Sequence, residues 1–248
     1  MFGGLFQKND FDIFSYTNVG GREINEDACC VFKKKGKGVC VVVADGLGGH
    51  GGGAVASRAA VTTISECFLN DNLNEAEDFM DWYVKANDAV RSMQNRECEM
   101  KTTMVTLMLK NNKAFWAHLG DSRLYHFVDD RLVEQTVDHS VSQMAVIRGD
   151  ITPEEIRGHE DRNRLLSALG RESKVKPDFS ATVRLDKGMH SFLLCTDGFW
   201  EYVLEKEMEK TLKRSEDARE WMGLMVDILK KRAKPNNDNN TAIAVNAW

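Results

Sequence analysis

The chain lacks several features that mark common classes of protein. It has only three prolines in 248 residues, which excludes long proline-rich linkers. None of its six cysteines stands in a Cys-x-x-Cys pair, so a structural zinc site is disfavoured and reduced core cysteines are expected. No apolar run is long enough for a signal peptide or a membrane span. We therefore expect a cytoplasmic protein without a membrane anchor.

Positive charge is also scarce. There are 33 lysines and arginines against 38 aspartates and glutamates, which gives a net charge of -5. A nucleic-acid binder normally presents a basic surface to the phosphate backbone, so this class is disfavoured. The length and the 42% hydrophobic content suit a globular protein with one large domain or two small ones.

Apolar segments of two kinds occur in blocks along the chain. Short runs bounded by turn residues predict strands, and longer stretches with apolar residues three and four apart predict helices. Because strands cluster and helices come in pairs, we expect an α+β protein with mostly antiparallel sheets. The predicted strands are 11–19, 28–32, 39–44, 103–109, 114–119, 124–128, 179–183, 191–196 and 241–246, and the predicted helices are 54–68, 75–94, 205–213 and 216–231.

Two local signals specify a turn and a helix start. Asp129-Asp130 predicts a hairpin turn after the strand 124–128. Thr152-Pro153-Glu154-Glu155 predicts a helix start. There Thr152 caps the backbone, Pro153 occupies the first helical position, and Glu155 completes a capping box.

Acidic residues stand at the ends of the strongest strands. The runs 39–44 and 191–196 lead into Asp45-Gly46 and Asp197-Gly198, Asp238 precedes the last strand, and Asp27 precedes the strand 28–32. Carboxylates that converge repel one another unless a cation joins them. Oxygen-only ligation suits Mg²⁺ or Mn²⁺, so a divalent-metal site is the first hypothesis.

Other interpretations exist for each of these segments alone. Asp45-Gly46, Gly120-Asp121 and Asp238-Asn239 are also ordinary turn sequences, and the polar residues 22–27 suit a charged loop. The glycine-rich stretch 46–53 lacks the Gly-Lys-Ser/Thr of a Walker loop. As a dinucleotide fingerprint it would place Asp45 beside a pyrophosphate, which is unfavourable.

Taken together, seven motifs in order resemble the metal-dependent serine/threonine protein phosphatases of type 2C, the PPM family, in their short bacterial form. The resemblance covers nearly the whole chain and implies one catalytic domain over residues 1–248. The motifs are R-x-x-N-E-D-A at Arg22, D-G-x-G-G-H at Asp45, G-D-S-R at Gly120, D-H-S at Asp138, A-L-G at Ala168, T-D-G at Thr196 and D-N-x-T at Asp238.

The resemblance implies a central antiparallel β-sandwich flanked by pairs of helices, with two core metal ions at one end and a flap at about 141–166. Metal ligands are expected from seven positions, and Arg22 is expected to grip the substrate phosphate, as the fork of a guanidinium suits. The expected metal positions are Glu26, Asp27, Asp45, Gly46, Asp121, Asp197 and Asp238.

The family assigns different roles to these positions. Asp45 resembles the carboxylate that bridges the two metals, assisted by the Gly46 carbonyl. Asp197 and Asp238 resemble ligands of one metal, and Glu26 and Asp27 hold the other, partly through water. A third, weaker ion is implied at Asp121, together with Asp197.

The implied reaction is direct hydrolysis of phosphoserine or phosphothreonine in proteins by a water held between Mn²⁺ or Mg²⁺ ions. Cys195 is not expected to be a nucleophile, because no Cys-x₅-Arg loop follows it. Animal members carry a histidine directly after the first Asp-Gly, where this chain has Leu47. We do not assign the role of general acid to His50, three residues further along the chain. For His139 we favour a structural role at the base of the flap.

Two other functions were weighed against an active phosphatase. A pseudophosphatase that serves as a binding module would have lost metal ligands, yet Asp27, Asp45, Asp197 and Asp238 are all present. Another two-metal hydrolase, such as a nuclease, is disfavoured by the acidic balance. We expect a monomer that acts on phosphoproteins made by a serine/threonine kinase.

Overall fold

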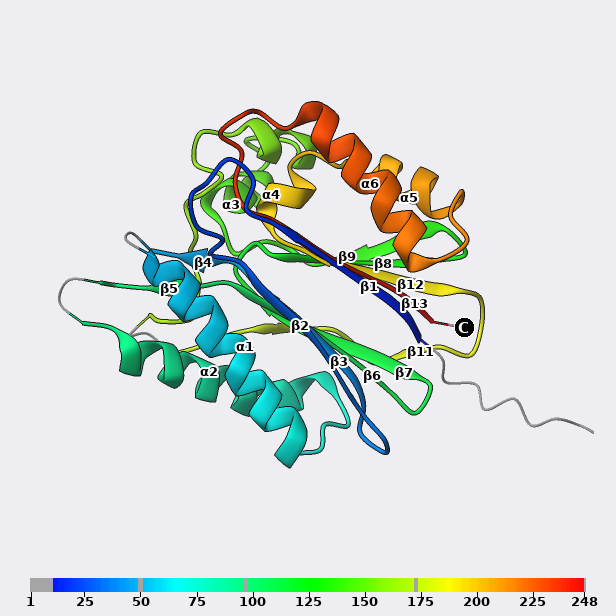
Figure 1. Ribbon diagram of the computed structural model, residues 1–248, viewed down its shortest axis with the longest axis horizontal. Coiled ribbons are helices and arrows are strands. Elements are labelled where there is room, and N and C mark those ends of the chain that lie inside the picture. Colours follow the sequence, from blue (N-terminus) through cyan, green and yellow to red (C-terminus); the bar gives the residue numbers. More distant parts are fainter. Residues whose placement is uncertain (1–10, 49–50, 96–97, 172–173, 248) are drawn as a thin grey trace, which may run out of the picture.

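The computed structural model describes residues 11–48, 51–95, 98–171 and 174–247. Two antiparallel sheets pack face to face, and helices cover the outer face of each sheet, which makes four layers (Figure 1). This is the α+β sandwich that the sequence predicts. Among the described residues, no helix combines the length and the apolarity needed to cross a membrane.

The first sheet contains the two ends of the chain side by side. Its strand order is β1-β13-β12-β8-β9. Strand β1 pairs with β13 along its whole length, from Phe11 opposite Ala247 to Asn18 opposite Asn240. The strands of this sheet are β1 (Phe11–Asn18), β8 (Arg123–Val128), β9 (Arg131–Gln135), β12 (His190–Cys195) and β13 (Asn240–Ala247).

The second sheet is built around two hairpins. Its order is β10-β7-β6-β3-β2, with β11 also paired to β7. A separate two-stranded ladder joins β4 (Gly46–Leu47) to β5 (Lys101–Thr102). The strands of the second sheet are β2 (Ala28–Lys34), β3 (Gly38–Ala44), β6 (Met104–Lys110), β7 (Lys113–Leu119), β10 (Asp178–Phe179) and β11 (Val183–Arg184).

Two groups of helices form the outer layers. Helices α1 (Gly52–Asn70) and α2 (Phe79–Met93), with the 3-10 helix η2 (Ala76–Asp78), cover the second sheet. Helices α4 (Asp197–Trp200), α5 (Glu205–Leu212) and α6 (Ala218–Arg232) cover the first sheet. Helix α3 (Val141–Arg148) and the 3-10 helix η3 (Pro153–Gly158) lie in the segment predicted to be the flap.

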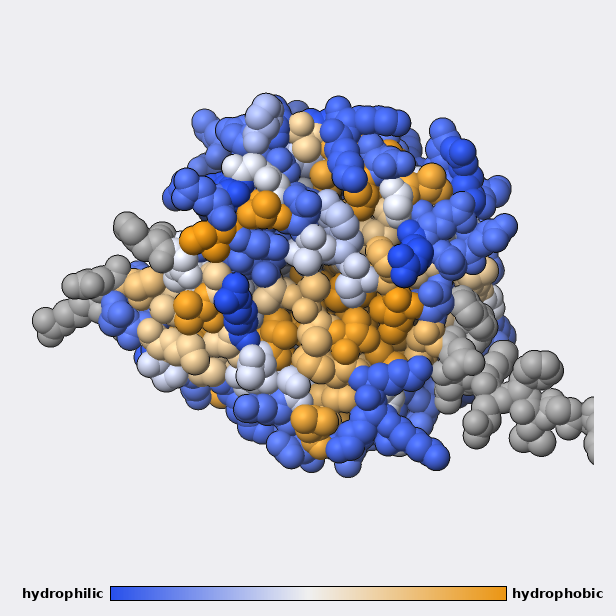
Figure 2. All heavy atoms as spheres, viewed as in Figure 1, coloured by the Kyte–Doolittle hydropathy of each residue, from blue (hydrophilic) through white to orange (hydrophobic). Residues whose placement is uncertain are grey.

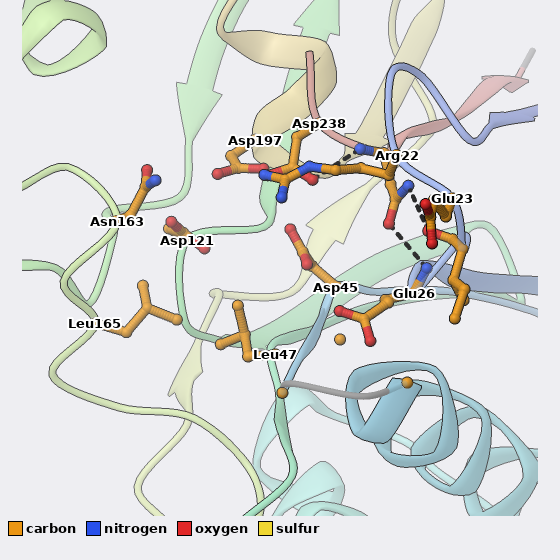
Figure 3. Close-up of a pocket in the computed structure, with 15 residues that line it drawn as sticks. Arg22, Glu23, Glu26, Asp45, Leu47, Asp121, Asn163, Leu165, Asp197 and Asp238 are labelled. Atoms are coloured by element: carbon orange, nitrogen blue, oxygen red, sulfur yellow. Dashed lines mark hydrogen bonds and ion pairs between the residues drawn. The ribbon is translucent and has the colours of Figure 1, made fainter. Parts of the chain in front are cut away.

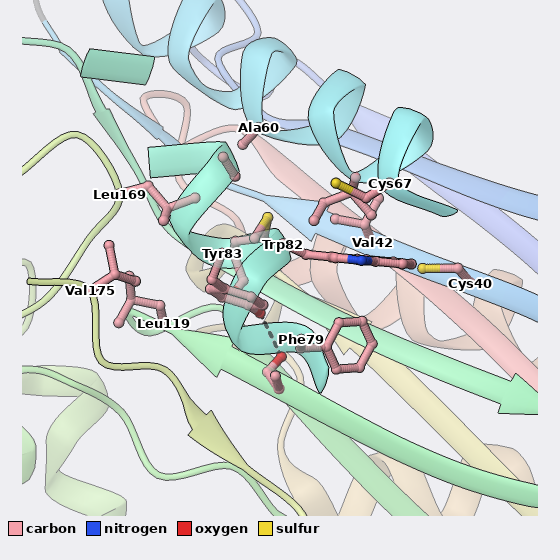
Figure 4. Close-up of a cluster of buried hydrophobic side chains, with 14 of the residues drawn as sticks. Cys40, Val42, Ala60, Cys67, Phe79, Trp82, Tyr83, Leu119, Leu169 and Val175 are labelled. Carbon is pink, nitrogen blue, oxygen red and sulfur yellow. Dashed lines mark hydrogen bonds between the residues drawn. The ribbon is translucent and has the colours of Figure 1, made fainter. Parts of the chain in front are cut away.

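The alternation of side chains along each strand produces three cores. In β3, Val39, Val41 and Val43 point between the sheets, whereas Cys40 and Val42 point toward α1 and α2. This period of two is the one expected for a strand buried on both faces. Figure 4 shows the core under α1 and α2, where the Tyr83 hydroxyl donates to the Ala117 carbonyl at 2.8 Å.

Strands β1 and β2 are the last strands on the same side of their sheets. Figure 2 shows apolar side chains gathered at this side of the sandwich. Ile13, Cys29 and Val31 are partly buried there against the core between the sheets. The sandwich is therefore less completely covered at this edge than on its two helical faces.

Two sequence predictions need correction. The strand expected at 179–183 is wrong, because β10 and β11 are two short pieces. Between them the Ser180 hydroxyl accepts a hydrogen bond from the Trp116 N–H at 2.8 Å, in place of a backbone carbonyl. The helix expected at 75–94 begins instead as the 3-10 turn η2, and α2 starts at Phe79.

Candidate metal centre

Six carboxylates line one pocket at the end of the sandwich (Figure 3). The pocket has a volume of about 530 Å³. Arg22 is the one arginine or lysine among the described residues that line it. The carboxylates belong to Glu23, Glu26, Asp45, Asp121, Asp197 and Asp238.

Strand pairing brings these carboxylates together from both sheets. Ala28 pairs with Ala44 at the end of the β2–β3 ladder, so Asp27 and Asp45 continue from neighbouring strand ends. In the other sheet, the Thr196 N–H donates to the Thr241 carbonyl at 3.0 Å, which sets Asp197 beside the residues that lead into β13. Because the sheets are stacked, the two pairs of strand ends meet at one edge.

Both Asp-Gly pairs need glycine because of close backbone contacts. A Cβ atom at Gly198 would collide with the carbonyl oxygen of Asn239, and one at Gly46 would collide with the carbonyl oxygen of Gly53. Glycine therefore lets the backbone after each aspartate approach its neighbour. This packing explains why the same dipeptide ends two strands of different sheets.

Burial and mutual repulsion raise the pKa of the central carboxyl groups. Burial raises the pKa of Asp27 to about 7, with Asp197 and Asp238 adding to the shift. The pKa of Asp197 is raised to about 6, again chiefly by burial and then by Asp238. Burial and the surrounding carboxylates also hold the pKa of Asp45 and of Asp121 above the usual range. Gathering these charges is unfavourable unless protons or cations neutralise them.

The donor set fits a bound cation. Oδ1 of Asp27 and Oδ1 of Asp197 are buried and have no hydrogen-bond partner in the part of the chain that the structure describes, although buried polar atoms are normally paired. The other oxygen of Asp27 accepts from the Thr196 hydroxyl at 3.0 Å. A Cβ atom at Gly53 would lie 2.6 Å from the Gly46 carbonyl oxygen and 2.8 Å from the Glu26 carboxyl carbon, so these two groups border the same small space.

Asn239 organises the loop that carries Arg22 and Glu26. Its side-chain oxygen accepts from the Glu26 N–H at 2.8 Å, and its amide nitrogen donates to the carbonyls of Val19 and Ile24 at 2.7 and 3.0 Å. Asn239 belongs to the D-N-x-T motif at Asp238, and no role is predicted for it from the sequence. Its position directly after Asp238 was the signal that could have identified it.

Arg22 lies at the rim of the pocket and pairs with an acidic residue there. Its guanidinium donates to Asp238 at 2.8 Å, and both side chains are partly exposed. The arginine is therefore held beside the carboxylate cluster by this ion pair. Figure 3 shows Arg22 and Asp238 on the same side of the pocket as Asp197.

Asp121 is held by a buried polar network behind the pocket. The indole N–H of Trp200, in the helix that begins at Asp197, donates to the Asp121 carbonyl at 3.0 Å. The Arg123 guanidinium lies 3.6 Å from the centre of a Trp200 ring and forms two hydrogen bonds to Asp138, at 2.8 and 2.7 Å. These contacts join the G-D-S-R, D-H-S and T-D-G segments.

A second group of possible ligands, His118, His139 and Asp178, fits a hydrogen-bonded network better than a metal. Nδ1 of His139 accepts from the Gly120 N–H at 3.1 Å, so Nε2 carries the proton that faces Asp178 at 3.3 Å. The two imidazole rings are stacked at 8° with centroids 4.8 Å apart, and no ion can lie in both ring planes. The His139 ring therefore supports the loop before Asp121, and the His139 carbonyl accepts a hydrogen bond from the Leu166 N–H at 2.8 Å.

Three further sequence assignments can now be located. Leu47 lines the pocket directly after Gly46. The Cys195 side chain packs toward α4, α5 and α6, and its burial raises the pKa of the thiol, which suits a core residue. His50 lies outside the described residues.

Known proteins of one family match this chain over nearly its whole length. The family described as Protein phosphatase 2C matches residues 18–239. The serine/threonine phosphatase Stp of Listeria innocua is 34% identical over 232 residues, which cover 90% of each chain. Protein phosphatase PhpP of Streptococcus pneumoniae is 28% identical over 204 residues, 79% of this chain and 82% of PhpP.

Solved structures agree with the sequence relatives. The serine/threonine phosphatase PstP of Mycobacterium tuberculosis superposes on this chain with a TM-score of 0.81 at 27% sequence identity. The match covers 96% of this chain and 98% of the PstP chain. The serine/threonine phosphatase Stp1 of Staphylococcus aureus superposes with a TM-score of 0.82 at 29% sequence identity. This match covers 100% of this chain and 99% of the Stp1 chain. The chain belongs to the protein phosphatase 2C family. It is a metal-dependent serine/threonine protein phosphatase, a hydrolase that acts on phosphoproteins.

Proposed function

We propose that phosphoserine and phosphothreonine are hydrolysed at the carboxylate cluster, with Mn²⁺ or Mg²⁺ held by its oxygens. The observation that carries this proposal is the gathering of carboxylates from both sheets. Two buried oxygens there, Oδ1 of Asp27 and Oδ1 of Asp197, have no hydrogen-bond partner among the described residues. Hard divalent cations favour such oxygen ligands. When bound, the ions supply an activated water and positive charge for the developing phosphate charge.

The positions of the acidic residues suggest which of them would hold each ion. Asp45 lies between the other acidic residues and is suited to bridge two ions, with the Gly46 carbonyl beside it. Asp197 and Asp238 would hold one ion, and Glu26 with Asp27 would hold the other. Asp121 and Asp197 would form a third, weaker position, because both line the pocket and, after burial, the charge of Asp197 is the main cause that raises the pKa of Asp121.

Arg22 orients the substrate. Its guanidinium fork can donate two parallel hydrogen bonds to phosphate oxygens, and its position at the rim suits a phosphate bound over the cluster. Leu47 has no group that can transfer a proton, so it does not protonate the leaving oxygen. The residues of the chain thus bind and align the phosphate, and they hold the cations that activate water.

The setting of the enzyme completes the proposal. Residues 1–248 act as one catalytic domain, and residues 141–166 form a flap whose end reaches the pocket through Asn163 and Leu165. The enzyme acts as a monomer in the cytoplasm on proteins phosphorylated by a serine/threonine kinase.

The test is the Asp197→Ala variant with a phosphothreonine peptide and Mn²⁺. We expect phosphate release to fall to the level of the wild-type protein in excess chelator, and calorimetry to show weaker Mn²⁺ binding. Asp186→Ala is the control, because it removes an exposed carboxylate that pairs with Arg184. Full turnover by Asp197→Ala, or by wild-type protein in chelator, would refute the assignment.

A further inference from the structure

The pocket has an apolar part as well as an acidic one. Asp121, Asp197 and Asp238 line it together with Leu47 and Leu165. Figure 3 shows the two leucines on the side of the pocket away from Asp197 and Asp238. Bound metal ions would be held by the acidic part, so the leucines remain available for contact with the substrate.

The two leucines come from different segments, and each is fixed through its backbone. Leu47 ends β4 and pairs with Lys101 of β5. Leu165 forms an antiparallel bridge with Ser140. Backbone hydrogen bonds flank this bridge on both sides. The Val141 N–H donates to the Arg164 carbonyl at 2.9 Å, and the Leu166 N–H donates to the His139 carbonyl at 2.8 Å. Both side chains are half-buried. The apolar part of the pocket is thus held on two paired segments.

A phosphopeptide must pass this apolar part. The phosphate is drawn to Arg22 and to the cations that the carboxylate cluster would hold, and the phosphorylated side chain is short, so the residue next to it lies within the same pocket. We propose that Leu47 and Leu165 form a subsite for an apolar side chain directly next to the phosphorylated residue. This inference rests on the proposed function and adds a substrate preference to it.

The chemistry of the pocket favours an apolar neighbour over a polar one. An apolar side chain against two half-buried leucines removes apolar surface from water, whereas an amide there loses water without gaining a partner. Partial burial of one leucine side chain corresponds to a preference of roughly three- to tenfold in kcat/KM.

The experiment compares phosphothreonine peptides that differ at one neighbour. Leucine or asparagine is placed directly before or directly after the phosphothreonine in an otherwise glycine- and serine-based peptide, and kcat/KM is measured with Mn²⁺. The expected result for the wild-type protein is a leucine-to-asparagine ratio of roughly three to ten at one of the two positions. A ratio near one at both positions would overturn the inference.

Variants assign the preference to the subsite. Leu165→Asn should bring the ratio close to one, and Leu165→Met should retain it. Leu166→Asn is the matched control, because Leu166 is 45% exposed and does not line the pocket, and the wild-type ratio should persist. An unchanged ratio in Leu165→Asn contradicts the inference, as does loss of the ratio in Leu166→Asn.

The readout separates this inference from the proposed function. A general loss of activity affects both peptides equally and cancels in the ratio. Failure of the wild-type protein to hydrolyse any of the peptides with Mn²⁺ would instead refute the proposed function, and the subsite with it. Hydrolysis without a preference refutes the subsite alone.

Discussion

At the scale of single residues, the site is a set of charges that the rest of the protein holds close together. Four aspartates have a raised pKa because they are buried beside one another. Perturbed groups of this kind mark functional sites, since a fold without a use for them would be expected to separate them. Arg22 is different, because it is partly exposed and forms an ion pair with Asp238 at the rim of the pocket.

For Arg22→Ala we expect a higher KM for a small aryl phosphate with little change in bound Mn²⁺. The arginine is placed to contact the phosphate, whereas the proposed metal ligands are carboxylates and a carbonyl. Steady-state kinetics and metal analysis of the same preparation check this. If the kinetic constants stay at the wild-type values, Arg22 does not belong to the phosphate site.

His126 provides a pH test away from the site. Its Nε2 lies 3.0 Å from Nδ1 of His190, and its own Nδ1 is buried without a partner. Burial lowers the pKa of His126 to about 4. An unfolded histidine titrates near 6.5, so between pH 6.5 and 4 the unfolded state binds more protons and stability falls as the pH falls.

We expect the free energy of unfolding of His126→Gln to fall less on acidification than that of the wild-type protein. The difference between the two slopes should be up to about 1.4 kcal/mol per pH unit between pH 6 and 5. The glutamine amide can still donate toward His190, so the comparison isolates the titration. Urea unfolding of both proteins at several pH values measures it. Parallel pH profiles would show that His126 does not contribute to the acid sensitivity.

At the scale of elements, one buried ion pair joins the start of β8 to the segment before α3. Arg123 and Asp138 are both almost fully buried. Removing the aspartate takes away both close hydrogen bonds of the buried guanidinium to Asp138 and leaves Glu205, 3.8 Å away, as its carboxylate partner. This is far more costly than the loss of an exposed pair.

We therefore expect Asp138→Ala to lower the free energy of unfolding by about 3–5 kcal/mol. The comparison is Asp161→Ala, whose partner Arg164 is 69% exposed, and there the expected loss is below about 1 kcal/mol. Urea denaturation with a common slope measures both. Equal losses in the two variants would contradict the role of the buried pair.

Local sequence determined many elements, and specific residues show why. The Thr152 and Glu155 capping box is present at the start of η3, and Asp129-Asp130 forms the turn between β8 and β9 with positive φ at both residues. These features depend on neighbours within four residues. The break between β10 and β11 was not predicted, because it depends on Ser180 bonding to Trp116, far away in the sequence.

At the scale of the whole molecule, the carboxylate cluster lies where the two sheets meet. Metal binding at the cluster should therefore change the stability of the folded protein. The pKa of Asp27 is raised to about 7 and that of Asp197 to about 6, against about 4 when unfolded. The stability that protonation of these groups confers on the metal-free protein is complete below pH 4 and is lost as the pH rises through 6 and 7.

Removal of metal by a chelator should therefore lower the Tm at pH 8, and the gap between metal-loaded and metal-free protein should narrow toward pH 6. Near pH 6, protons neutralise carboxylates that only cations neutralise at pH 8. Protons also compete with the cations for the same oxygens. Calorimetric scans with and without Mn²⁺ measure the gap. A Tm that ignores the chelator at pH 8 would contradict a metal site in this cluster.

The sequence by itself determined the strands that end in acidic residues, the ordered motifs, and with them the family and the expected ligand positions. Only the tertiary structure decided that Asn239 holds the Glu26 loop, that Trp200 and Arg123 support Asp121, and that Leu47 and Leu165 share one pocket. The physical reason is range. Strand periodicity and turn chemistry act between near neighbours, whereas these contacts arise only after two sheets stack and distant segments meet.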